Sequence, residues 1–132
     1  MSKTCSYILV VEDDEDIRLQ MTAVLKDEGY RVEAVENGRA ALDHLLAAAP
    51  DKLPACIILD LMMPVMTGGQ FLQIVRQDHA AQFGHIPVLV ATAKGSPKEE
   101  LLGLPAHIRR IKKPMELDEF LAAVGDHCGS PA

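Results

Sequence analysis

The sequence predicts an α/β domain with a doubly wound, five-stranded parallel sheet and five helices. Short apolar runs alternate five times with stretches whose apolar residues recur at helical spacing. A parallel sheet joined by right-handed crossovers and covered on both faces accommodates that alternation. The 132 residues contain no repeat, low-complexity tract or interdomain linker, so we expect a single domain over 1–132. Its core should cover about 7–124, and the small, polar residues 125–132 should form a flexible tail.

Each expected strand is a short, largely apolar run bounded by turn residues or charges. The expected strands are 8–11, 31–35, 56–59, 86–92 and 107–111. Each expected helix buries a stripe of apolar residues spaced three or four apart. The stripes and helical segments are Ile17/Met21/Val24/Leu25, Ala41/Leu42/Leu45/Leu46, Phe71/Leu72/Ile74/Val75, 98–102 and Leu117/Phe120/Leu121/Val124. Gly29 should end the first helix, Asn37 and Gly38 should start the second, and 77–85 should be a polar linker.

Composition excludes several classes of function. A net charge of −6 argues against general binding to nucleic acids or anionic membranes, because both need a basic surface. The three cysteines lie far apart without CxxC spacing, which favours reduced thiols over disulfides or a zinc site. The five histidines show no metal-ligand spacing and are expected at the surface. No signal peptide and no run of about 20 apolar residues is present, so we expect a soluble, cytoplasmic protein.

Polar side chains follow several of the expected strands at the point where each strand ends. They are Glu12 and Asp13, Asp60, Thr92, and Lys113. Because the carboxyl ends of parallel strands share one sheet edge, these residues should gather there, where α/β sheets bind ligands. Carboxylates brought close together repel one another, and Mg²⁺ would relieve the repulsion. A hydroxyl and an ammonium beside them suit an incoming phosphoryl group.

The acidic residues also have a purely structural interpretation. Negative charge is favourable in the first turn of a helix, and Asp60 can serve simply as a helix cap. The run Glu12, Asp13 and Asp14 exceeds what one cap requires, and strands elsewhere in the chain end on polar groups as well. The convergence of these ends therefore favours a site over isolated caps.

Four motifs carry a resemblance to a known family. In order they are ILVVEDDEDIR, IILDLMMPVMTG, PVLVATA and IKKP, and each alone is weak. Together, over about Tyr7 to Val124, the chain resembles the receiver domains of response regulators, the CheY-like superfamily with a flavodoxin-like fold. That resemblance implies the strand order 2-1-3-4-5. It also implies a two-component or phosphorelay role, in which a sensor histidine kinase or a histidine phosphotransfer protein supplies the phosphoryl group.

The resemblance assigns the acceptor and the metal site. Asp60 resembles the phospho-accepting aspartate. Glu12 and Asp13 resemble the acidic pair that holds Mg²⁺, or Mn²⁺, together with Asp60 itself and the backbone carbonyl of Met62. The reaction implied is self-phosphorylation and autodephosphorylation at Asp60, so the chain is not expected to be an enzyme acting on free substrates.

The resemblance also assigns the switch. Thr92 and Lys113 resemble the hydroxyl and lysine that follow the new charge, and Pro114 resembles a cis proline. Lys94 and Met62 occupy positions that tune the lifetime of the phosphate. The family places an aromatic residue where this chain has Arg110, and because an unpaired guanidinium is costly to bury, we expect Arg110 to stay exposed.

The expected output is altered binding of a downstream protein at the face made by 98–102, 107–111 and 117–124, from a monomer or weak dimer. The Met1 start favours a complete single-domain regulator, and the alternative is a module of a larger regulator or hybrid kinase. A haloacid-dehalogenase-like phosphatase would need a second Asp where Met62 stands. A flavodoxin-like cofactor binder would place phosphate against the acids after the first strand. The basic run 109–113 is either a guarded edge strand or a patch for an acidic partner.

Overall fold

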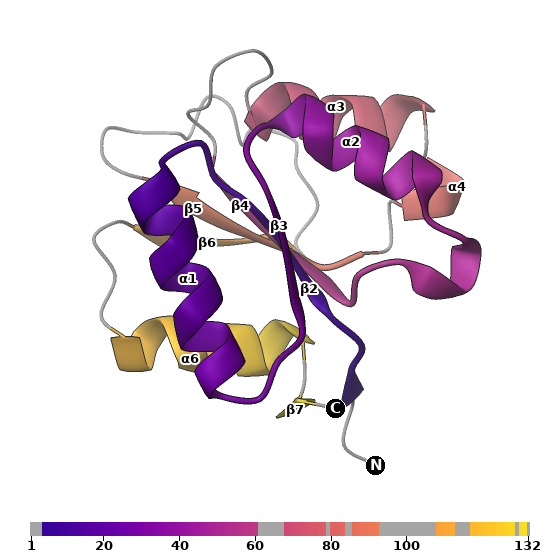
Figure 1. The fold of residues 1–132 in the computed structure, drawn as a ribbon. Helices are drawn as coiled ribbons and strands as arrows, with labels where there is room; N and C mark the ends of the chain where they lie inside the picture. Colours follow the sequence, from indigo (N-terminus) through magenta and orange to yellow (C-terminus); the bar gives the residue numbers. More distant parts are fainter. Residues whose placement is uncertain are drawn as a thin grey trace.

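A parallel sheet with helices on both faces forms the body of the molecule (Figure 1). The structure is a computed structural model, and it describes residues 4–60, 68–78, 80–83, 86–92, 108–112, 117–128 and 130–131. The strands are β1 (Thr4–Cys5), β2 (Ile8–Val11), β3 (Val32–Val35), β4 (Cys56–Asp60), β5 (Val88–Thr92), β6 (Ile108–Lys112) and β7 (Ser130–Pro131). The helices are α1 (Glu15–Asp27), α2 (Gly38–Ala47), the 3₁₀ turn η1 (Pro50–Lys52), α3 (Gly68–Asp78), α4 (Ala80–Phe83) and α6 (Leu117–Cys128).

The main sheet has the order β3-β2-β4-β5-β6, and all neighbouring strands in it run parallel. In chain order this is the second, first, third, fourth and fifth strand of the main sheet, the order that the resemblance implies. The predicted α/β class with a parallel sheet is therefore confirmed. The basic segment β6 lies at one edge of the sheet, the position expected of a guarded edge strand. The helix expected at 98–102 falls outside the described residues.

The central strands bury both of their faces, so the core has two layers. Leu9 and Val11 of β2 point to the layer under α2, α3 and α4, whereas Ile8 and Val10 point to the layer under α1 and α6. Figure 1 shows these two groups of helices on opposite faces of the sheet. The four residues of β2 are at most 1% exposed, which is why a continuous apolar run forms this strand.

Local signals set two helix ends where the sequence places them. The Asn37 side chain accepts a hydrogen bond from the backbone N–H of Ala40 at 2.8 Å and caps α2. Gly29 follows α1 with φ of 98°, a left-handed conformation that favours glycine, and its N–H donates to the carbonyl of Lys26. Both of these predicted boundaries are confirmed.

Two segments differ from the sequence-based expectation. The polar linker expected at 77–85 contains the short helix α4, because Phe83 packs into the core with 5% exposure and anchors a helical turn that composition alone did not indicate. The helix α6 continues past Val124 to Cys128, since one glycine weakens a helix without ending it. Beyond it, β7 pairs with β1, which the sequence did not indicate. In the described ranges, no helix is long and apolar enough to cross a membrane.

Candidate functional site at the carboxyl edge of the sheet

The strand register sets Asp60 beside the acidic end of β2. Val11, the last residue of β2, pairs with Leu59 of β4, so Glu12 and Asp60 each follow by one residue at the same level. Asp60 pairs in turn with Ala91 of β5. The backbones of the proposed acceptor and of the acidic pair therefore meet at one edge, as the parallel topology requires.

The same edge receives the ends of the next two strands. Thr92 ends β5 one residue beyond the level of Asp60, and it pairs with Lys112, the last residue of β6. Arg110 lies within β6, where it pairs with Val90. For Asp60, Thr92 and Arg110 the structure describes the backbone but not the side chain.

Four further predicted site residues lie outside the described part of the chain. They are Met62, Lys94, Lys113 and Pro114. Lys113 directly follows the end of β6 in the sequence. The roles assigned to these four residues, and the exposure expected of Arg110, stay predictions.

Glu12, the residue that directly follows β2 at this edge, has a buried carboxylate. Its exposed fraction is 1%, and it is the buried charged residue among the side chains that the structure describes. Its backbone N–H donates to the carbonyl of Val35, and its Oε2 accepts from the backbone N–H of Asp14 at 3.3 Å. Burying a charge is costly unless the charge is compensated. A buried acid beside further acids is therefore suited to a cation.

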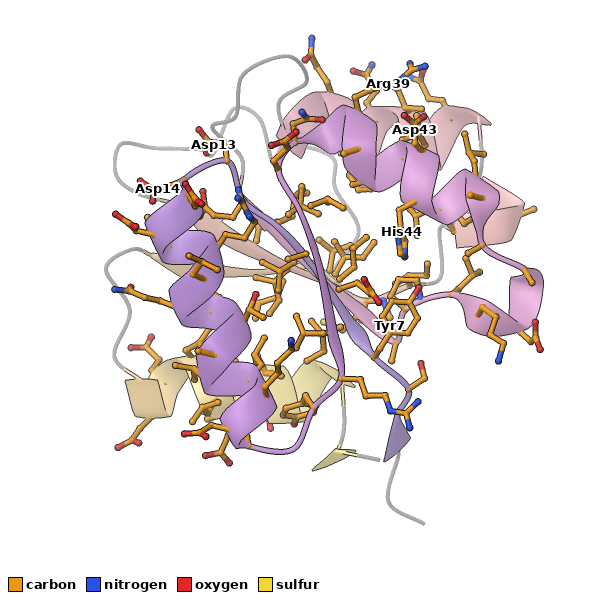
Figure 2. All side chains as sticks on the ribbon, in the orientation of Figure 1. Tyr7, Asp13, Asp14, Arg39, Asp43 and His44 are labelled. Atoms are coloured by element: carbon orange, nitrogen blue, oxygen red, sulfur yellow. The ribbon has the colours of Figure 1, made fainter. Side chains whose placement is uncertain are left out.

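Asp13 and Asp14 are neighbours with different roles (Figure 2). Both are exposed where β2 gives way to α1. Asp14 has extended backbone and caps α1, because its Oδ1 accepts from the backbone N–H of Ile17 at 3.0 Å. The structural reading of the acids is thus correct for Asp14, and it leaves the carboxylate of Asp13 available at the surface of the site.

Arg18 is a residue of this site that the sequence analysis did not single out. It lies in the second turn of α1, is partly buried, and donates from Nη1 to the backbone carbonyl of Glu12 at 3.0 Å. A cation at helical spacing after an acidic run was the available signal. The spacing alone did not show that the side chain reaches back toward the strand.

The donor set suits a hard divalent cation. Glu12 and Asp13 offer carboxylate oxygens, the ligands that Mg²⁺ prefers when it keeps several of its waters. Within the side chains that are described, no group of three or more His, Cys, Asp or Glu is placed to hold a metal ion. The expected third carboxylate, that of Asp60, is not among those side chains. Glu12 and Asp13 therefore offer two carboxylates that fit such an ion.

A second polar cluster lies near the amino-terminal ends of the strands, opposite the edge that carries Asp60. The hydroxyl of Tyr7 donates to the carbonyl of Lys52 at 2.8 Å and lies 3.0 Å from Nε2 of His44. Figure 2 shows Tyr7 and His44 together, far along the sheet from Asp13. They line an open cavity of about 520 Å³ between β3, α2 and η1. Burial, followed by the charge of Glu33, raises the pKa of Tyr7 above its ordinary value.

Comparison with known proteins identifies the family. The model of the response regulator receiver domain matches residues 8–125. The chain is 38% identical over 116 residues to the response regulator MprA of Mycolicibacterium vanbaalenii, which covers 87% of this chain and 47% of that protein. It is 35% identical over 119 residues to the response regulator Rre1 of Synechocystis, with 89% and 49% covered. The chain thus spans about half the length of these curated relatives.

Solved structures agree with the family match. The chemotaxis protein CheY4 of Vibrio cholerae has a TM-score of 0.77 and 31% identity, with 96% of this chain and 99% of that chain covered. The receiver domain of the sensor histidine kinase PA1611 from Pseudomonas aeruginosa, which has a magnesium ion in its active-site cleft, has a TM-score of 0.78. At 22% identity, with 97% and 98% covered, that second likeness shows the fold alone. The chain therefore belongs to the response regulator receiver domain family, whose members carry signals in two-component phosphorelays.

Proposed function

We propose that this receiver accepts a phosphoryl group on the carboxylate of Asp60 and uses the new charge to change how a partner protein binds. The observation that carries the proposal is the register at the carboxyl edge, where Asp60 ends β4 level with Glu12. An acceptor carboxylate on a strand next to a buried acid and an exposed acid suits phosphoryl transfer, because the acids could hold a divalent cation that neutralises the phosphoryl charge.

In the proposed reaction an oxygen of Asp60 attacks phosphorus in line with the leaving group. The bond from phosphorus to the donor breaks as the bond to Asp60 forms, and the electron pair leaves with the imidazole of a phosphohistidine or with acetate. Water later attacks phosphorus, the bond from phosphorus to the Asp60 oxygen breaks, and inorganic phosphate leaves as the carboxylate is restored. Bound Mg²⁺, or Mn²⁺, supplies neutralisation of the phosphoryl charge. Glu12, Asp13, Asp60 and the carbonyl of Met62 would hold it.

The residues on the next strands would sense the transferred group. Thr92 would donate its hydroxyl to a phosphoryl oxygen, and the ammonium of Lys113 would pair with the charge. The end of β5, at Thr92, and the end of β6 lie side by side at this edge, which supports a shared response. We propose that the response reaches the face formed by 98–102, β6 and α6, with Arg110 exposed and Lys94 and Pro114 shaping the switch.

The remaining features of the proposal concern the setting of the protein. The donor is a sensor histidine kinase or a histidine phosphotransfer protein, and the target is a protein rather than nucleic acid or membrane. We place the chain in the cytoplasm as a monomer or weak dimer, and we expect 98–102 to supply the crossover helix between β5 and β6. It modifies itself and does not turn over a free substrate, because Met62 stands where a dehalogenase-like phosphatase needs its second Asp.

Intact-mass spectrometry tests the proposal. The full chain is incubated with acetyl phosphate and Mg²⁺, and wild type is compared with Asp60→Ala and the isosteric Asp60→Asn. We expect a labile adduct of one phosphoryl group on wild type only, and its loss when Mg²⁺ is chelated. Labelling that resists alkali and hydroxylamine, an adduct on Asp60→Ala, or steady turnover of added phosphate esters would contradict the proposed function.

A further inference from the structure

The turn from β2 into α1 is closed by three hydrogen bonds around Asp13. Arg18 Nη1 donates to the carbonyl of Glu12 at 3.0 Å, and the N–H of Asp14 donates to Glu12 Oε2 at 3.3 Å. The N–H of Ile17 donates to Asp14 Oδ1 at 3.0 Å. Asp13 therefore lies between two residues that are both held, with its own side chain exposed.

The hydrogen bond from Arg18 to the Glu12 carbonyl lies just past the last paired residue of β2. The paired part of β2 stops at Val11, so the peptide that joins Glu12 to Asp13 lies beyond the sheet register. The guanidinium is anchored on a helix whose first turn is itself capped, and it reaches six residues back along the chain. A donor held in this way fixes the plane of the 12–13 peptide and hence the direction in which Asp13 leaves the backbone.

We propose that Arg18 is a positioning residue for the divalent cation: by holding the Glu12 carbonyl it keeps Asp13 in the conformation that binds the ion. This inference rests on the proposed function, since it concerns the same metal site. Without the tether, the turn samples other conformations, and the apparent affinity falls in proportion to the competent fraction. The positive charge of Arg18 has the opposite tendency, because it repels a bound cation. Replacing Arg18 by an uncharged residue should therefore weaken Mg²⁺ binding if the tether dominates, and strengthen it if the charge repulsion dominates.

The experiment measures the dissociation constant of Mg²⁺ for the ¹⁵N-labelled full chain from the backbone amide shifts of residues 12–14. Arg18→Met removes donor and charge, and Arg18→Lys keeps the charge with one donor group. Arg31→Met is the matched control, because Arg31 is exposed at the opposite edge of the sheet and the charge change is identical. Thermal unfolding verifies that every variant is folded.

We expect Arg18→Met to weaken Mg²⁺ binding by about three- to tenfold, the range that one lost hydrogen bond supports. Arg18→Lys should recover part of the loss, and Arg31→Met should match wild type. The loss of Mg²⁺ affinity in Arg18→Met should be at least as large at about 0.5 M KCl as at about 0.05 M, because the roughly threefold shorter Debye length screens the charge repulsion and leaves the effect of the lost hydrogen bond.

Unchanged or tighter binding in Arg18→Met would overturn the inference, and tighter binding would show that charge repulsion dominates. A loss that disappears at high salt would overturn it as well. If wild type itself bound no Mg²⁺ and gained no phosphoryl group on Asp60, the proposed function would fail first. Wild type that binds and reacts normally, beside an unaffected Arg18→Met, would remove the positioning role alone.

Discussion

Replacing Asp14 separates the structural use of the acidic run from its chemical use. Asp14→Ala removes the oxygen that accepts from the N–H of Ile17 at 3.0 Å. Losing such a cap costs about 1 kcal/mol of stability. The loss should lower the free energy of global unfolding, because α1 buries Met21 and Leu25 in the core. For a chain of 132 residues, 1 kcal/mol corresponds to a fall of about 4 °C in Tm.

Two matched variants sharpen this prediction. Asp14→Asn keeps a capping oxygen without the charge, so it should cost no more than about 0.5 kcal/mol at this exposed position. Asp13→Asn alters an exposed carboxylate beside the cap, so without metal its stability should stay within about 0.5 kcal/mol of wild type. On the proposed function, Asp13→Asn should lose the stabilisation that Mg²⁺ gives to wild type, whereas Asp14→Ala should retain it.

Urea unfolding followed by far-ultraviolet circular dichroism suits these measurements, since the chain has no tryptophan. Each variant is unfolded with Mg²⁺ and with a chelator. The reasoning is refuted if Asp14→Ala is as stable as wild type, or if Asp14→Asn loses as much as Asp14→Ala. The division of roles is refuted if Asp13→Asn still gains stability from Mg²⁺ as wild type does.

Two further predictions test the core and the opposite edge of the sheet. Leu45→Ala should cost about 3 kcal/mol in urea unfolding, because Leu45 is 1% exposed. Its neighbour Leu46 is 51% exposed, so Leu46→Ala should cost less than about 1 kcal/mol, and equal costs would contradict the burial of α2. For Tyr7, burial and then the charge of Glu33 raise the pKa above 10.0 in the folded state. The stabilisation that follows is complete below the unfolded pKa and is lost as the pH rises through the folded one. Thermal unfolding of Tyr7→Phe should therefore fall less steeply than that of wild type above about pH 10, and parallel curves would argue against this pKa shift.

The fold class followed from the sequence because each local signal agrees with the next. The run 8–11 is apolar at every position, as expected of a strand that is buried on both faces. Asn37 marks a helix start through its side-chain hydrogen bond, and Gly29 marks a helix end through its left-handed backbone conformation. The motifs at Asp60 and at the acidic pair were readable for a related reason. In a parallel sheet the end of a strand specifies an edge, so position in the chain already implies position in space.

Other features depend on contacts between segments that composition does not reveal. The helix α4 forms because Phe83 packs into the core, although the residues around Phe83 in the sequence are largely polar. The histidine at position 44, expected at the surface, is partly buried and lies within hydrogen-bond distance of Tyr7, which is 37 residues away in the chain. No periodic pattern in the sequence predicts either the burial of Phe83 or the contact between Tyr7 and His44.

By itself, then, the order of residues determined the alternating elements, the face that each buries, and the sheet edge at which the backbones of Glu12, Asp60 and Thr92 lie, because hydrophobic period and strand polarity are local properties. Tertiary structure decided how the acids at that edge divide their work. Glu12 is buried, Asp14 caps a helix, Asp13 remains exposed, and Arg18 reaches back to hold the turn. Four charged residues close together in the chain acquire different roles because burial and hydrogen bonding depend on where the backbone carries each side chain.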